Sequence, residues 1–146
     1  MTIVDEELDG YSRRFAARLF EKFPEWRDGA SADPDHRGAL RVAVTAPSGA
    51  QLQVRTYSAQ ITIDFGAHWH EHLGVWTSAE EQLVFDKALQ RIDDLVNDRV
   101  VIVSRFVFGR HAWSRALPLA EVRRAFSGRR SVTSWSGITQ PPLSGI

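Results

Sequence analysis

The sequence contains no cysteine, only two lysines among its 18 basic residues, and one methionine. Without cysteine the chain forms no disulfide, offers no thiolate nucleophile and builds no Cys-ligated zinc site. No apolar run approaches the roughly 20 residues that a membrane-spanning helix needs. The chain begins with an acidic segment instead of the basic and apolar regions of a signal peptide. We therefore expect a cytoplasmic protein with no membrane partner.

Charge is distributed unevenly along a chain whose formal net charge is zero. Residues 1–98 hold 10 Lys+Arg against 17 Asp+Glu, a balance of −7, whereas residues 99–146 hold 8 Arg against a single Glu, a balance of +7. Either the two parts neutralise each other within one fold, or the basic part faces an acidic partner.

The hydrophobic pattern of the first segment predicts a helix that ends before Pro24, with Thr2 and Asp5 near its start. Its apolar stripe recurs at spacings of three and four residues: Leu8, Tyr11, Phe15 and Leu19. A polar loop, residues 28–38, should follow. Alternating apolar residues in 40–44, 52–56 and 61–65 then predict a three-stranded meander whose first turn lies at residues 47–49.

The second half of the chain alternates in the same way around a central helix. Ser78 and Glu81 have the spacing of a capping box, and the buried stripe expected after them is Phe85, Ala88, Leu89, Ile92, Leu95 and Val96. Two strands, 100–108 and 111–117, should pair through a turn at Gly109-Arg110. A short helix over 118–126, ended by Gly128, and a last strand over 131–136 complete the elements.

This order of elements predicts an α+β fold with a mostly antiparallel sheet of about six strands. Two main helices and one short helix should lie on one face of it. We expect one domain over residues 1–146, with the N-terminal helix in 1–27, the sheet and central helix in 39–137, and a tail in 138–146. The chain lacks βαβ alternation with a Gly-rich phosphate loop, which argues against a Rossmann domain, a P-loop NTPase and a kinase.

The densest chemistry follows the strand that ends at Phe65. Three histidines, His68, His70 and His72, occupy alternate positions after Gly66, and in an extended segment their imidazoles point to one side. They suit zinc or iron, with Asp64 as a further ligand or an orienting group. The alternative is that the imidazoles only cap the end of the sheet, because Gly66 interrupts the strand. A metal-dependent enzyme is therefore one hypothesis, and a site without cofactor is the other.

Arginine and aromatic residues are interleaved in the C-terminal part, a mixture that also occurs on sheets that bind single-stranded nucleic acid. The set comprises Arg99, Arg105, Arg110, Arg115, Arg123, Arg124, Arg129 and Arg130, with Phe106, Phe108, Trp113 and Trp135. The neutral overall charge and the acidic remainder of the chain argue against nucleic acid as the partner.

Five tryptophans, at positions 26, 69, 76, 113 and 135, are many for this length. We expect two or three in the core, and partial exposure of Trp69 and Trp135. Because Trp and Arg dominate the energetics of protein interfaces, the composition suits a protein-binding module.

Two short patterns resemble a known family. The first is Ile61-Thr62-Ile63-Asp64-Phe65-Gly66 leading to His68-Trp69-His70-Glu71-His72, and the second is Ser134-Trp135-Ser136-Gly137 after a basic hairpin. Over roughly residues 52–137 the chain resembles the small α+β immunity proteins encoded beside bacterial polymorphic toxins. The resemblance implies a cytoplasmic, non-catalytic inhibitor that covers the active site of its cognate toxin.

The leading hypothesis is therefore a protein-binding inhibitor without a catalytic residue or cofactor. Its predicted contact residues are Asp64, Trp69, His70, Trp76, Arg105, Arg110, Arg115 and Trp135. The metal-dependent enzyme and the nucleic-acid binder remain as alternatives.

Overall fold

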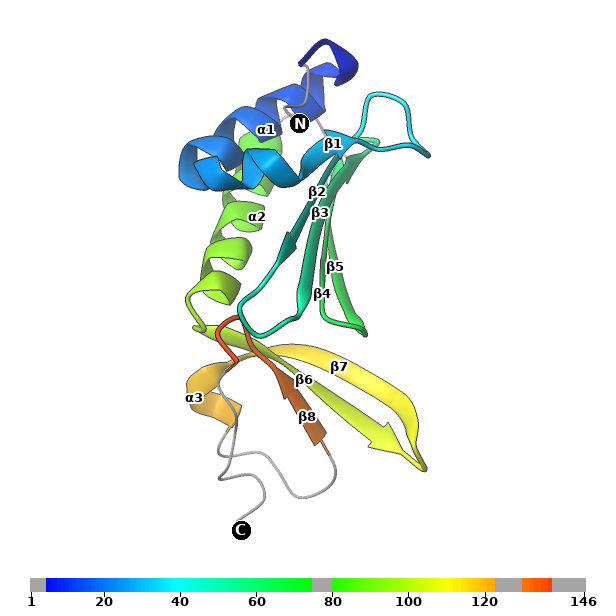
Figure 1. Ribbon diagram of the computed structural model, residues 1–146, viewed down its shortest axis with the longest axis vertical. Coiled ribbons are helices and arrows are strands. Elements are labelled where there is room, and N and C mark those ends of the chain that lie inside the picture. The colour runs from blue at the N-terminus through cyan, green and yellow to red at the C-terminus, as the bar shows by residue number, and fades with distance from the viewer. Residues whose placement is uncertain (1–4, 75–79, 123–129, 138–146) are drawn as a thin grey trace. The chain divides into compact units, whose positions relative to one another are not determined.

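The structure is a computed structural model that describes residues 5–74, 80–122 and 130–137 (Figure 1). It confirms the α+β class, with eight strands among these described residues, in two antiparallel sheets of five and three strands. The chain divides into two units: residues 1–44, 52–64 and 70–90 form the first, and residues 45–51, 65–69 and 91–146 the second. No helix in the described part of the chain is long and apolar enough to cross a membrane.

The larger sheet has the strand order β1-β2-β3-β4-β5, so that strands adjacent in sequence are adjacent in space. Its strands are β1 (Ala30–Ala32), β2 (Leu40–Thr45), β3 (Gln51–Tyr57), β4 (Gln60–Phe65) and β5 (Trp69–Gly74). Burial alternates along β3 and β4, as the predicted meander requires. The α-helix α1 (Gly10–Lys22) and the first part of α2 (Glu81–Val96) cover one face of this sheet (Figure 1).

Aromatic packing joins the two helices of the first unit. The ring of Phe85 on α2 lies 5.2 Å from that of Tyr11 and 5.3 Å from that of Phe15, both on α1. Phe15 and Phe85 are completely buried. A buried hydrogen bond of 2.5 Å between the hydroxyls of Ser12 and Thr56 joins α1 to β3. Most of the predicted stripe residues that belong to this unit are buried: Leu8, Phe15, Leu19, Phe85, Ala88 and Leu89.

The start of α1 differs from the prediction. Asp9 caps the helix by accepting a hydrogen bond of 2.7 Å from the Ser12 backbone N–H. Asp5 lies in a 3₁₀ turn (η1, Asp5–Glu7), and Thr2 lies outside the described residues. The helix ends at Lys22, as predicted, and Pro24 opens a second 3₁₀ segment (η2, Pro24–Gly29). Pro fits that first position because it has no backbone N–H to satisfy.

The predicted loop over residues 28–38 contains the short strand β1, which pairs antiparallel with β2 through Ala30↔Val42 and Ala32↔Leu40. Close backbone packing precedes it: a Cβ added to Gly29 would lie 2.3 Å from the carbonyl oxygen of Ala43. Glycine is therefore required at position 29 for the chain to approach β2.

The end of α2 is a Schellman motif. The Asp98 N–H donates to the Leu95 carbonyl at 3.2 Å and the Arg99 N–H to the Asp94 carbonyl at 2.9 Å. Asp98 occupies the left-handed position (φ +55°), where glycine is usual. Its carboxylate accepts hydrogen bonds from the backbone N–H groups of Trp135 (3.0 Å) and Ser136 (3.2 Å). This aspartate therefore joins the end of the helix to the segment after the last strand.

The second unit contains the smaller sheet, with strand order β7-β6-β8. Its elements are β6 (Val100–Val107), β7 (Arg110–Pro118), the short helix α3 (Leu119–Val122) and β8 (Arg130–Thr133). Val101, Val103 and Val122 form a buried hydrophobic cluster, and the partly buried Trp113, Leu117, Leu119 and Val132 pack against them. The second sheet arises because β6 pairs with β7 and β8, which strand patterns alone do not specify. Ser78, Phe126, Gly128 and residues 138–146 lie outside the described residues.

Candidate functional site

Among the described residues of the second unit, the most exposed large apolar side chains lie at the turn between β6 and β7. We name residues 105–115 the ribbon. Val107 pairs with Arg110, which leaves Phe108 and Gly109 as a two-residue turn. Both have positive φ angles, +51° and +77°, as in a type I′ turn. The turn was predicted one residue later, at Gly109-Arg110.

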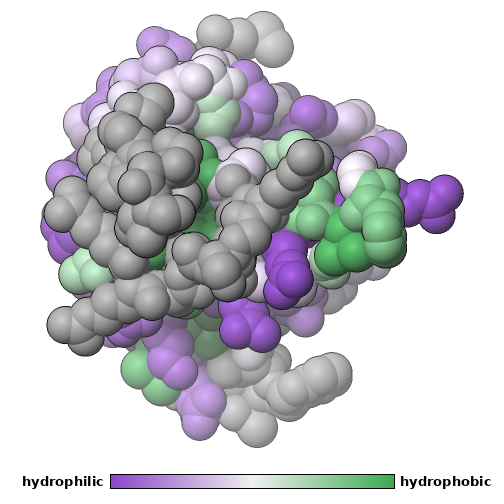
Figure 2. Space-filling view, turned by 90° about the horizontal axis from the view of Figure 1, so that it is seen from below, coloured by the Kyte–Doolittle hydropathy of each residue, from purple (hydrophilic) through white to green (hydrophobic). Residues whose placement is uncertain are grey.

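Phe108 makes the turn unusual. Its side chain is 101% exposed, and the neighbouring Val107 is 42% exposed. Type I′ turns favour Asn, Asp or Gly at both central positions, because other residues are strained at positive φ. An aromatic residue here therefore adds strain to the turn without burying its ring. On the side where Figure 1 places this turn, the space-filling view shows an exposed hydrophobic group beside hydrophilic residues (Figure 2).

A β-bulge arranges the arginines of the ribbon. Arg105 pairs with Trp113 and Phe106 with His111, so Ala112 is an extra residue in β7. Residues directly opposite each other in an antiparallel pair share a face. The register therefore places Arg105, Arg110 and Arg115 on one face, together with Val107 and Trp113. In a regular strand with no bulge, Arg110 and Arg115, five positions apart, would lie on opposite faces.

These three arginines are exposed. Residues 100–118 contain no Asp or Glu, and no described residue forms an ion pair with Arg105, Arg110 or Arg115. The Arg115 guanidinium lies over the Trp113 ring, 4.9 Å from its centroid. The ribbon therefore combines an apolar tip with a face of uncompensated positive charge.

An aromatic cluster covers the opposite face of the ribbon. The His111 ring stacks on that of His68, with 4.3 Å between centroids and 11° between planes. The Phe106 ring is steeply inclined to both imidazoles, with 5.6 and 5.7 Å between centroids and 76° and 72° between planes. His111 Nε2 lies 2.7 Å from the Ser114 hydroxyl, which in turn lies 2.6 Å from that of Ser104. These contacts hold the ribbon against the turn that precedes β5.

The other two histidines of the predicted cluster lie on β5. Their rings contact each other, with 5.0 Å between the centroids of His70 and His72. His72 Nδ1 is also 2.9 Å from the Thr62 hydroxyl. Gly66 does interrupt the strand, as predicted, with φ +71°. Within the described residues no three His, Asp or Glu side chains form a group that would hold a metal ion. The geometry thus adds no support to a site formed by His68, His70 and His72.

The remaining predicted contact residues have different environments. Asp64 forms an ion pair with Arg55, with 3.0 Å between the carboxylate oxygen and the guanidinium nitrogen. Trp69 is 8% exposed, so the prediction of its partial exposure is wrong; its position in β5 faces the core side of the sheet. Trp135 is half-buried, with its ring 6.2 Å from that of Phe65. His70 is exposed, and Trp76 lies outside the described residues.

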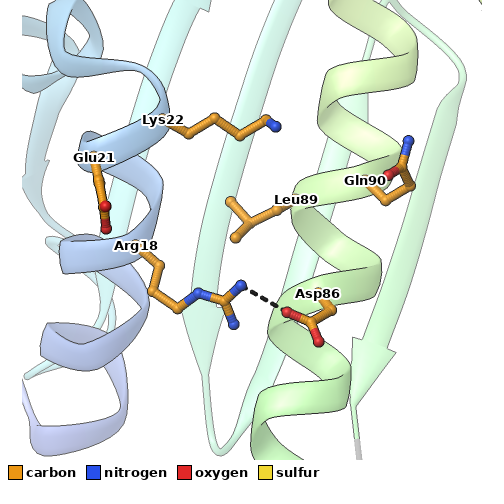
Figure 3. A pocket seen from close by; sticks show the side chains of 6 residues that line it. All are labelled: Arg18, Glu21, Lys22, Asp86, Leu89 and Gln90. Carbon is orange, nitrogen blue, oxygen red and sulfur yellow. Dashed lines mark hydrogen bonds and ion pairs between the residues drawn. The ribbon is translucent and has the colours of Figure 1, made fainter.

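A polar surface hollow of about 570 Å³ lies between α1 and α2 (Figure 3). Arg18 reaches from α1 to Asp86 on α2 at 2.6 Å, and Leu89 points into the space between the helices. Nearby, Arg14 forms a bidentate pair with Glu81 (2.9 and 2.7 Å), which lowers the pKa of that carboxyl through the hydrogen bond. Arg14 and Arg18 are thus both ion-paired within the chain. The hollow lies along the line of contact between α1 and α2, which we call the seam.

Sequence reasoning named Phe108 only among the aromatic residues of the nucleic-acid alternative, and it did not select Val107. The signal for Phe108 was present: antiparallel strands of matched length around Phe108-Gly109 require a two-residue turn with positive φ at both positions.

Comparison with models of known protein families, with curated proteins and with solved structures finds no match.

Proposed function

We propose that this protein is a non-catalytic, protein-binding inhibitor of the immunity type, which neutralises a cognate bacterial toxin in the cytoplasm by covering its active site. The observation that carries the proposal is Phe108, fully exposed and in a left-handed conformation at the tip of the ribbon. The family resemblance and the absence of cysteine are consistent with it.

The energetic argument concerns what Phe108 contributes to the isolated chain. A left-handed conformation costs a non-glycine residue roughly 1 kcal/mol. Nothing offsets this cost through burial, because the ring is fully exposed. Burying an aromatic ring in a partner's pocket would contribute about 1.5–3 kcal/mol. Burial of the Phe108 ring in a complex would therefore outweigh the conformational cost that the isolated chain leaves uncompensated.

The ribbon supplies the centre of the proposed contact surface, with Val107 and Phe108 inserted and Arg105, Arg110 and Arg115 around them. Exposed arginines beside an aromatic anchor are typical of interface hot spots. His70 and the half-buried Trp135 stay as proposed peripheral contacts from the sequence prediction. Asp64 and Trp69 are less suited, because one is ion-paired and the other is buried.

A protein partner fits the ribbon better than single-stranded nucleic acid does. Base stacking needs open aromatic faces, and Arg115 covers one face of Trp113. Val107 offers no stacking face and requires an apolar pocket. A metal-dependent enzyme lacks a comparable supporting observation in the described residues.

Co-expression tests the proposal. The toxin encoded beside this chain's gene should be lethal alone and harmless with the wild-type chain, and the two should co-purify as a stable complex. Phe108→Asp should weaken the complex about 100-fold or more, because it places a charge in the apolar pocket. Binding is measured by calorimetry on the purified proteins.

Leu83→Asp is the matched control, since Leu83 is also an exposed hydrophobic residue (50%) but lies on α2. It should bind as tightly as the wild-type chain. The absence of an adjacent toxin gene, a lack of protection, or equal effects of both substitutions would contradict the proposal.

A further inference from the structure

We infer that the partner surface engaged by the ribbon is acidic: an apolar pocket surrounded by protein carboxylates, as in a carboxylate-lined active-site cleft. This inference rests on the proposed protein-binding function and adds the chemistry of the partner. An acidic partner surface favours a target whose cleft is lined by carboxylates over a nuclease, because the cleft of a nuclease must be basic to hold phosphates.

The first step is the charge balance of the ribbon itself. The arginines Arg14, Arg18, Arg55 and Arg99 each pair with a carboxylate within the chain. The strands of the ribbon contain no acidic residue over positions 100–118, and Arg105, Arg110 and Arg115 have no ion pair among the described residues. The positive charge at the ribbon is therefore left for a partner to neutralise.

The second step is the alignment of these charges. The bulge at Ala112 brings Arg110 onto the same face as Arg105 and Arg115. Like charges gathered on one face of the ribbon repel each other. Carboxylates of a partner that face these arginines would attract them and so replace repulsion with attraction. Bidentate contacts between guanidinium and carboxylate groups would also fix the orientation of docking.

The third step combines the charged face with the apolar tip. Val107 shares the arginine-bearing face, and Phe108 follows it at the turn. The partner must therefore bury apolar side chains within a few residues of its carboxylates. Active-site clefts that use paired carboxylates for acid–base chemistry have both features, a desolvated pocket and negative charge.

The test uses the purified complex with the adjacent toxin. The triple variant Arg105→Glu/Arg110→Glu/Arg115→Glu should weaken binding about 100-fold, whereas the triple Lys variant should lose less than tenfold because it keeps the charge. Lys87→Glu, an exposed change of the same sign on α2, should have no effect. Converting the toxin's carboxylates to amides with carbodiimide and glycinamide should abolish binding, and prior complex formation should protect them.

A second probe separates this inference from the proposed function. An immobilised glutamate–tyrosine copolymer should bind the wild-type chain but not the triple Glu variant, while a 20-nucleotide oligo-dT should bind neither. If Phe108→Asp abolishes toxin binding and the triple Glu variant does not, the acidic-partner inference fails and the proposed function stands. If the toxin does not bind but the copolymer does, the proposed function fails and the inference survives. Binding of oligo-dT that is lost in the triple Glu variant would overturn the inference in favour of nucleic acid.

Discussion

The seam between α1 and α2 and the β6–β7 ribbon both carry arginine and aromatic side chains, yet they use them differently. In the seam, Arg14 and Arg18 reach carboxylates on α2, and the rings of Phe15 and Phe85 are completely buried. In the ribbon, the arginines have no carboxylate within the described chain and Phe108 is fully exposed. The difference indicates that residue type alone does not identify a binding surface: the residues must also be left unsatisfied by their own fold.

The largest effect should come from the aromatic core of the seam. Phe85→Ala should lower the free energy of unfolding by about 3–5 kcal/mol, because it leaves a cavity between α1 and α2. Urea denaturation followed by circular dichroism measures the change. Phe108→Ala should change stability by less than about 0.5 kcal/mol, since the ring contacts little. Similar losses for the two variants would contradict the contrast between the regions.

A smaller effect of opposite sign is expected at the ribbon tip. Phe108→Asn should raise the free energy of unfolding by up to about 1 kcal/mol, because Asn tolerates the left-handed position of a type I′ turn. The same substitution should weaken toxin binding, so stability and affinity should change in opposite directions. Thermal unfolding and calorimetric titration of one preparation provide both values. A loss of stability would show that Phe108 packs within the free protein.

The smallest effect concerns a buried hydroxyl in the seam. Burial, with a further contribution from Glu81, raises the pKa of Tyr11 to about 12 from its ordinary value of 10.0. The folded chain therefore holds this proton more tightly than the unfolded chain does, and its stabilising effect is lost as pH rises from about 10 to 12. Tyr11→Phe should reduce that alkaline loss.

At neutral pH, Tyr11→Phe should be within about 0.5 kcal/mol of the wild-type chain, because the hydroxyl oxygen is buried and finds no hydrogen-bond partner among the described residues. Urea titrations at pH 7 and at pH 11 give the comparison. Equal pH dependence of both proteins would show that Tyr11 does not account for alkaline destabilisation.

The sequence predicted the elements that depend on long regular patterns. Alternation defined β2, β3 and β4, and the stripe from Phe85 to Leu95 defined α2. It did not predict β1, whose three residues are too few to show alternation, and it placed the start of α1 too early because several acidic residues precede Asp9. Nor do strand patterns specify pairing, which is why two sheets were predicted as one.

The candidate site was predicted only in part, for a similar reason. Arg105, Arg110 and Arg115 stood out by composition, but their common face depends on a bulge that no residue type announces. Trp69 was predicted from its polar neighbours to be partly exposed, yet its parity in β5 directs it inward. Exposure and register are tertiary properties, and they decided which of the predicted residues form a surface.

The extra residue at Ala112 also has a consequence for how this protein can diverge. Deleting that single codon would leave Arg110 and Arg115 four positions apart in a regular strand, and residues four apart share a face. The arginine-bearing face would thus survive a one-residue deletion that removes only the bulge and its local twist. Relatives that share this face would then differ by a gap in this strand, and an ungapped motif would fail to group them.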